Sequence, residues 1–142
     1  MLLVDVNVLV NAFREDSPDH LPFRSWLTEL VNSEIPFGVA DLVLSGFLRI
    51  TTHPKIFDPP SPLEDALRFV EILRAQPNCT VAVPGQRHWQ IFTQLCRATG
   101  AKGNSIPDAY FAAMAIEAEA EWITADRGFK RFPDLNWRHP LG

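Results

Sequence analysis

Residues 1–10, MLLVDVNVLV, open the chain with an apolar run that only Asp5 and Asn7 interrupt. An apolar run of this length predicts a buried strand over residues 2–9. A carboxylate inside a buried strand is costly unless another group replaces its lost hydration, and Asp5 has no capping role there. Asn7 lies on the same face of such a strand, where it holds a water, orients a carboxylate or makes a structural hydrogen bond. The stretch therefore predicts that Asp5 has a partner elsewhere in the chain.

Composition restricts the class of protein. The chain has 142 residues, of which 46% are hydrophobic and 21% charged, as expected for one globular domain over residues 1–142. A net charge of -4 argues against a basic protein that wraps nucleic acid, although it leaves room for a local basic patch. The two cysteines have no metal-binding or redox spacing, and no apolar run is long enough for a membrane span. We therefore expect a cytoplasmic protein without a membrane partner.

Strand and helix patterns alternate along the chain. Strands are expected at residues 2–9, 35–40, 79–83, 121–125 and 136–140, and helices at residues 17–33, 41–52, 61–76, 86–99 and 105–120. This alternation predicts an α/β sandwich with a mostly parallel sheet of about five strands. In such a sheet the carboxyl ends of the strands lie along one edge, where functional sites form.

Three aspartates are predicted to lie on this edge. Asp5 lies toward the carboxyl end of the first strand, and Asp126 directly follows strand 121–125. Asp108 lies in the first turn of helix 105–120, whose start faces the same edge. The carboxylates meet if the first strand and strand 121–125 are neighbours. Clustered carboxylates need a proton or a cation, and hard oxygen ligands favour Mg²⁺ or Mn²⁺. The matching chemistry is metal-assisted hydrolysis of a phosphodiester.

Simpler roles compete with this prediction. Asp108 follows Ser105 at the spacing of a capping box, so it has a capping role that can coexist with a site. Asp126 lies in a good turn sequence, and Asp41 is most simply a helix N-cap.

Basic side chains near these acids are candidate phosphate contacts. Arg127, Lys130 and Arg131 follow Asp126, and Arg49 lies one helical turn after Ser45. Arg49, Arg127 and Lys130 could contact a phosphate backbone. The alternatives are a solvated charged loop for Arg127 and Lys130, and an ion pair with an acid for Arg49.

The same residues carry a resemblance to a known family. The chain resembles the PIN-domain ribonucleases, specifically the VapC toxins of toxin–antitoxin pairs. The resemblance spans nearly the whole chain and rests on LLVDVNVLV (2–10), LVLSGFLRITTHPKIF (42–57), IPDAYFAAMAIEAEAEWITADRGFKRFP (106–133) and NWRHPL (136–141).

The resemblance implies a fold, an activity and partners. The fold would be a three-layer α/β/α sandwich, and the activity that of an endoribonuclease toxin that cuts tRNA or rRNA and so inhibits translation. Mg²⁺ or Mn²⁺ would bind Asp5, Asp108 and Asp126, with Asn7 and Thr124 as flanking polar residues. The protein would be a homodimer, neutralised by a VapB-type antitoxin whose tail enters the active-site groove.

One position departs from the family pattern. Many members carry a Glu where this chain has Gly46, so a site with four acids is in doubt. Asp41, at the start of the same helix, is a hypothetical substitute acting through a water. The departure motivates an alternative function, a catalytically weak or inactive PIN-like module that binds RNA or a partner. A third hypothesis, a phosphatase with Asp5 as nucleophile, is weakened because Asn7 interrupts the Asp-x-Asp pattern.

Overall fold

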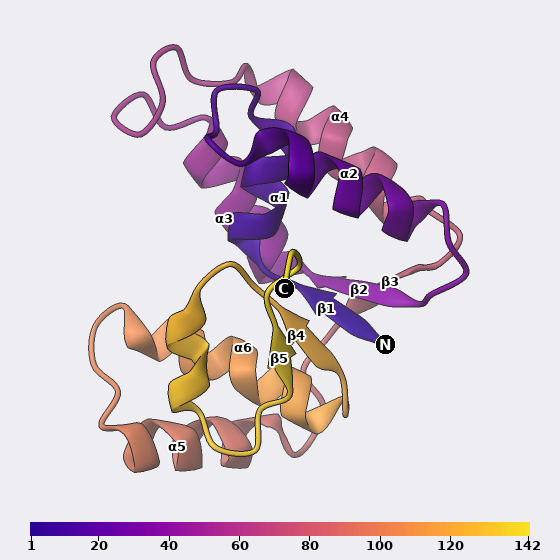
Figure 1. Cartoon of the computed structure of the whole chain (residues 1–142). Coiled ribbons are helices and arrows are strands. Elements are labelled where there is room, and N and C mark those ends of the chain that lie inside the picture. The colour runs from indigo at the N-terminus through magenta and orange to yellow at the C-terminus, as the bar shows by residue number, and fades with distance from the viewer.

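The fold is built on a parallel sheet in the strand order β3-β2-β1-β4-β5, shown in Figure 1. The computed structural model describes all residues from 1 to 142. All four strand pairs are parallel. The strands are β1 (Leu2–Val4), β2 (Phe37–Ala40), β3 (Cys79–Ala82), β4 (Glu121–Ile123) and β5 (Trp137–Arg138).

Helices cover both faces of the sheet (Figure 1). One face carries α1 (Val6–Phe13), α2 (His20–Val31), α3 (Asp41–Thr51) and α4 (Leu63–Arg74). The other carries α5 (His88–Thr99), α6 (Ser105–Glu117) and the short 3₁₀ helix η1 (Arg127–Arg131). The predicted three-layer α/β/α sandwich with a parallel sheet of about five strands is confirmed. None of the helices has the length and apolar character needed to cross a membrane.

The first strand and the strand before Asp126 are neighbours, as the convergence of the aspartates requires. β1 pairs with β4 through Leu3 and Trp122 and through Val4 and Ile123. The chain adds β2 and β3 on one side of β1 and then returns to place β4 on the other side. The carboxyl ends of β1 and β4 therefore flank the switch point of the sheet, where open α/β folds form their binding crevice.

The prediction of one strand over residues 2–9 is wrong. β1 ends at Val4, and Asp5 is the N-cap of α1, with its Oδ1 accepting the backbone N–H of Val6 at 2.7 Å. Buried Val8, Leu9 and Ala12 follow a helical spacing. A short apolar run rich in valine fits a buried strand and a buried helix equally, and here the tertiary packing selects the helix. Contrary to the prediction, Asp5 thus has a capping role.

The start of α2 and the capping of α3 and α6 also differ from their predictions. α2 begins at His20 with Asp19 as N-cap, later than the expected start at Ser17. Asp41 is the first residue of α3 and makes no capping hydrogen bond. The capping box of α6 does not form, because the Ser105 hydroxyl accepts the Lys102 N–H at 2.8 Å while Asp108 binds a side chain elsewhere.

Small residues bring α6 close to the sheet. Four of its six buried residues are alanines, namely Ala109, Ala112, Ala113 and Ala115, all fully buried. Phe111 of the same helix stacks on Trp122 of β4 with a centroid distance of 5.4 Å. This tight packing fixes the first turn of α6, and with it Asp108, at the carboxyl edge of β4.

Candidate active site

Asp5 is the buried centre of a hydrogen-bond network at the end of β1. Only 6% of its surface is exposed. Its Oδ1 caps α1, and its Oδ2 accepts the Thr124 hydroxyl at 2.7 Å and the Asn7 amide at 3.2 Å. Both carboxylate oxygens are therefore held in fixed directions by groups from two different elements.

Asn7 and Thr124 join the ends of β1 and β4. The Asn7 Oδ1 accepts the backbone N–H of Ala125 at 2.9 Å, and its amide also donates to the Thr124 hydroxyl at 3.2 Å. The Thr124 Oγ1 in turn accepts the backbone N–H of Asp126 at 3.0 Å. Of the roles open to Asn7, the structure shows both the orientation of a carboxylate and a structural hydrogen bond. The two side chains position Asp5 and Asp126 relative to one another.

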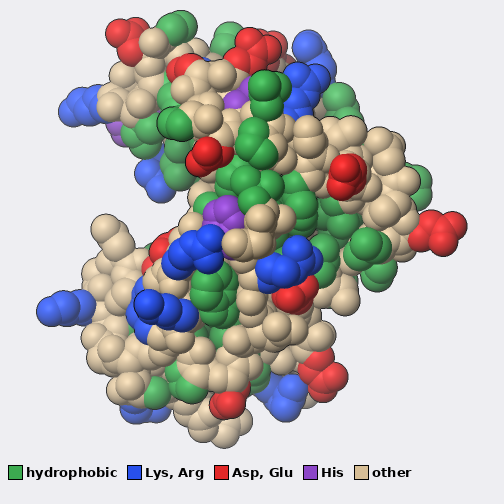
Figure 2. Space-filling view, viewed as in Figure 1, with side chains coloured by type: hydrophobic (Ala, Val, Ile, Leu, Met, Phe, Trp, Pro, Cys, Tyr) green, Lys and Arg blue, Asp and Glu red, His purple; other side chains and the backbone are tan.

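The three predicted acids line one cavity of about 560 Å³. Asp5 enters it from the end of β1, Asp108 from the first turn of α6 and Asp126 from the loop after β4. The opposite wall comes from α3 and includes Ser45, Gly46 and Arg49, which lie in the cavity lining with α1 residues such as Asn11. Figure 2 shows the surface hollowed between the helix layers that carry α3 and α6, with basic side chains on both sides of the hollow.

The electrostatic environment of the cavity acts most strongly on Asp5. The pKa of its carboxyl group is raised from 3.8 to about 6, mainly by burial and in smaller part by the negative charges of Asp108 and Asp126. The hydrogen bonds from Thr124 and from the Val6 N–H act in the opposite direction and do not offset the burial. A nearby cation would favour the ionised form of this carboxyl group.

Asp108 has a cation partner within the chain. Its Oδ2 accepts a hydrogen bond from the Arg131 Nη2 at 2.7 Å, and the two side chains are about one third exposed. Asp126 instead accepts the backbone N–H of Gly128 at 2.8 Å. The sequence does not predict this ion pair, because no spacing connects Arg131 with Asp108.

The side chains of the cavity are of the kind that binds a hard divalent cation, but they are too far apart to hold one in this conformation. The candidate ligands in the cavity are the carboxylate oxygens of three aspartates, and Mg²⁺ and Mn²⁺ prefer such ligands. No group of three His, Cys, Asp or Glu side chains is close enough to hold a metal ion in the present arrangement. The contact between Arg131 and Asp108 is one physical reason, because it directs one carboxylate toward an internal cation.

The predicted basic residues lie in different places. Arg49 lines the cavity from α3. Arg127 is exposed and donates to the carbonyl oxygen of Gly142 at 3.4 Å, and Lys130 is exposed on η1; neither lines the cavity.

The positions of Gly46 and Asp41 show whether either residue can supply a fourth acid to the cavity. Gly46 lines the cavity, and a Cβ there would lie 3.2 Å from the Val6 Cγ2. Asp41 is 73% exposed, does not line the cavity and lies 3.8 Å from Arg74. Its suggested role as a substitute ligand therefore has no support from its position.

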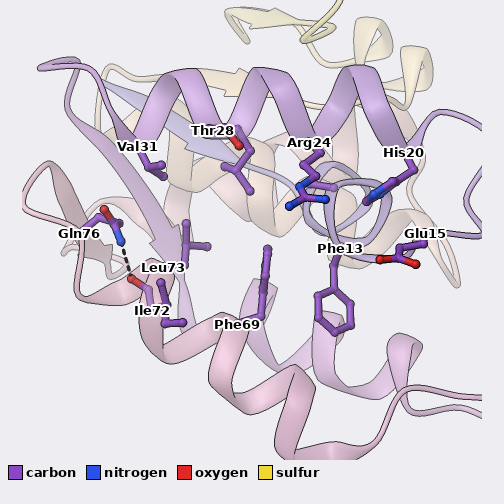
Figure 3. Close-up of a pocket in the computed structure, with 12 residues that line it drawn as sticks. Phe13, Glu15, His20, Arg24, Thr28, Val31, Phe69, Ile72, Leu73 and Gln76 are labelled. Atoms are coloured by element: carbon purple, nitrogen blue, oxygen red, sulfur yellow. Dashed lines mark hydrogen bonds between the residues drawn. The ribbon is translucent and has the colours of Figure 1, made fainter.

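A second cavity, of about 370 Å³, has a different character. It lies between α2 and α4, and Figure 3 shows Phe13, Phe69 and Leu73 facing Arg24 and His20 across it. Glu15 is its one acidic lining residue, so it lacks the donors for carboxylate–metal chemistry.

Comparison with known proteins shows the family of the chain. The family model of the PIN domain matches residues 2–135. Ribonuclease VapC43 of Mycobacterium tuberculosis is 48% identical over 99% of this chain and 96% of its own length, and Ribonuclease VapC25 of the same species is 42% identical over 99% of both chains. The structure of VapBC-1 from nontypeable Haemophilus influenzae has the same fold, with a TM-score of 0.70 and 16% identity over 99% of this chain and 98% of that chain. The match of the PIN model and the identity to full-length relatives show that the chain belongs to the PIN-domain family and, within it, to the VapC ribonucleases.

Proposed function

We propose that the protein is a Mg²⁺- or Mn²⁺-dependent endoribonuclease whose metal-binding and catalytic acids are Asp5, Asp108 and Asp126. The observation that carries the proposal is the position of these carboxylates around one cavity at the switch point of the sheet. Members of the PIN-domain nucleases are generally metal-dependent, and this donor set suits the same ions.

The residues around the cavity have defined tasks in this reaction. A bound divalent ion would polarise the scissile phosphate and lower the pKa of the attacking water. Thr124 and the N-terminus of α1 hold Asp5 in one orientation, so the carboxylate needs no reorganisation when the substrate binds. Apolar Val6, Phe111 and Phe129 in the lining exclude water beside the acids and strengthen their electrostatic interactions.

The substrate and partners follow from the same proposal. The RNA is tRNA or rRNA, whose cleavage inhibits translation, and Arg49, Arg127 and Lys130 contact its phosphates. The protein acts as a homodimer in the cytoplasm and is neutralised by a VapB-type antitoxin. The names of the relatives and the VapBC-1 complex of Haemophilus influenzae support the toxin–antitoxin assignment.

RNA cleavage by the purified chain, freed of any antitoxin, tests the activity. We expect cleavage of total cellular RNA with Mg²⁺ or Mn²⁺ and none with EDTA. Asp108→Asn should lose cleavage, whereas Asp65→Asn, which removes an exposed carboxylate of α4 outside the cavity, should keep it. Normal cleavage by Asp108→Asn would refute the assignment of this acid.

Two observations favour a second candidate function, a PIN-like module that binds RNA or a partner without cutting. The cavity has glycine at position 46, and Asp108 is already neutralised by Arg131. Such a module would bind RNA equally well in Mg²⁺ and in EDTA. Failure of the wild-type protein to cut any cellular RNA, together with metal-independent binding, would favour this function.

A phosphatase with Asp5 as nucleophile has less support. Both oxygens of Asp5 already accept hydrogen bonds, and the side chain is almost fully buried. A nucleophile must instead reach the phosphorus atom of its substrate. A covalent phosphate on Asp5, detected by mass spectrometry, would be required to support this function.

A further inference from the structure

Arg131 is held more firmly than an ordinary surface arginine. Its Nη2 donates to the Asp108 Oδ2 and its Nη1 donates to the Gly128 carbonyl oxygen, both at 2.7 Å. Its guanidinium carbon lies 4.6 Å from the ring centroid of Phe132 and 5.9 Å from that of Phe129. Two directed hydrogen bonds and two aromatic rings therefore fix the guanidinium plane beside Asp108.

The same guanidinium lies beside a second acid. A Cβ built on Gly128 would lie 2.8 Å from the Arg131 Nη1 and 2.9 Å from the Asp126 Oδ1. The arginine and the Asp126 carboxylate thus face each other across a glycine that has no side chain to separate them. Among the ion pairs of the structure, the one made by Arg131 is the only one that reaches any of the three cavity acids.

We propose that Arg131 is an internal counter-ion that competes with a divalent cation for Asp108, and that its displaced guanidinium becomes a ligand for the RNA phosphate. The inference rests on the proposed function, because it assumes that Asp108 binds the metal. A guanidinium and a divalent cation cannot both take the same carboxylate oxygen. Arg131 therefore lowers the apparent metal affinity of the free protein.

Once displaced from Asp108, the Arg131 guanidinium has the chemistry to bind an RNA phosphate. A guanidinium binds phosphate oxygens with the same paired hydrogen bonds that it gives to a carboxylate. The Phe129 and Phe132 rings keep it near the mouth of the cavity after its contact with Asp108 is lost. Arg131 thus acts as a substrate-binding residue, and its release couples metal binding to RNA binding.

Calorimetric titration with Mn²⁺, in the absence of RNA, tests the competition. Arg131→Gln should bind Mn²⁺ about 3- to 10-fold more tightly than the wild type. Arg138→Gln is the matched control, because Arg138 pairs with Glu121 at 3.3 Å away from the cavity and its loss should leave the affinity unchanged. A merely structural role for Arg131 would predict weaker metal binding or none.

A measurement on the unaltered protein covers the case in which the variant does not fold. The ¹⁵N side-chain resonances of Arg131 should shift on addition of Mg²⁺, while those of Arg138 should stay in place. If Arg131 does not respond to saturating Mg²⁺, the competition is refuted. Equal Mn²⁺ affinity of folded Arg131→Gln and wild type would also refute it while leaving the metal site intact. Failure of the wild type to bind either ion would overturn the metal-dependent nuclease and this inference together.

Binding of an RNA made resistant to cleavage by 2′-deoxy substitution tests the phosphate contact. At saturating Mg²⁺, Arg131→Gln should bind this RNA about 3- to 10-fold more weakly than the wild type, and the slope of log affinity against log salt should decrease by about one phosphate contact. Unchanged RNA affinity in the variant would refute the transfer of Arg131 to the phosphate.

Discussion

Replacement of Asp5 by asparagine is expected to stabilise the metal-free protein at neutral pH while removing its metal-dependent activity. Burial holds the pKa of this carboxyl group near 6, above its ordinary value of 3.8. A carboxyl group with a raised pKa binds its proton more tightly in the folded state than in the unfolded state. The free energy of unfolding of the wild type therefore falls as the pH rises from about 4 to about 6, and stays low above that range.

The size of the effect follows from the two pKa values. A rise from 3.8 to about 6 corresponds to a cost of about 3 kcal/mol for the ionised Asp5 above pH 6. Asparagine carries no charge and remains a good N-cap for α1. It exchanges one acceptor oxygen for an amide that faces Asn7 and Thr124, which costs about 1–2 kcal/mol. The net gain expected at pH 7 is about 1–2 kcal/mol.

Urea unfolding of the wild type and of Asp5→Asn at pH 4.5 and at pH 7.5, both in EDTA, measures this gain. The variant should be the more stable protein at pH 7.5, and its advantage should shrink or reverse at pH 4.5. Asp16→Asn is a control of opposite sign, because its hydrogen bond with Arg14 holds the pKa of Asp16 below its ordinary value. The reasoning is refuted if Asp5→Asn is less stable at pH 7.5, or if its advantage is the same at both pH values.

Three further substitutions test other parts of the site. Thr124→Val should lower the free energy of unfolding by about 1–3 kcal/mol, because it removes the hydroxyl that donates to Asp5 and accepts the Asp126 N–H. Thr124→Ser keeps the hydroxyl and should retain most of the wild-type stability, and unchanged stability of Thr124→Val in urea would contradict this reasoning. Gly46→Glu adds an acid to the cavity and should tighten Mn²⁺ binding several-fold in calorimetry. The gain in helix propensity and the close contact of the new Cβ with Val6 oppose each other, so the free energy of unfolding should stay within about 1 kcal/mol of the wild type. Gly128→Ala places a methyl group between Asp126 and Arg131 and should lower both the melting temperature and RNA cleavage, so that wild-type values for both would show that the glycine is not needed.

Much of the fold was predictable because its signals are local and repeated. The alternation of strands and helices gives the parallel sheet, and Gly100, with a φ of 62°, ends α5 where the sequence places a stop. Residues 6–9 are predicted as strand but begin α1, because valine-rich segments satisfy strand and helix patterns alike over so short a length. The register of β1 against β4 depends on contacts between residues about 120 positions apart, which one sequence does not show.

The site was predictable only in part, for a related physical reason. Topology alone places the residue that follows β1, the loop after β4 and the first turn of α6 at one edge of the sheet, so the convergence of Asp5, Asp126 and Asp108 on one cavity was predictable. The contact of Arg131 with Asp108 was not predictable, because it depends on the path of η1 and on two phenylalanine rings. Such a contact has no fixed spacing in sequence.

Under the proposed function, the network around Asp5 gives a physical reason for a costly group in a buried place. The α1 N-terminus and Thr124 supply hydrogen bonds that favour the ionised carboxylate, while burial and the charges of Asp108 and Asp126 oppose ionisation. The opposing effects leave the pKa near 6, so the carboxyl group is mostly ionised at neutral pH. The hydrogen bonds to this carboxylate do not fully offset the cost of its lost hydration. A cation that entered the cavity, as the proposed function requires, would remove the unfavourable part of this balance, and the free energy released would add to its binding. Asparagine would make a more stable fold at this position, but it would offer a cation no unsatisfied charge to bind.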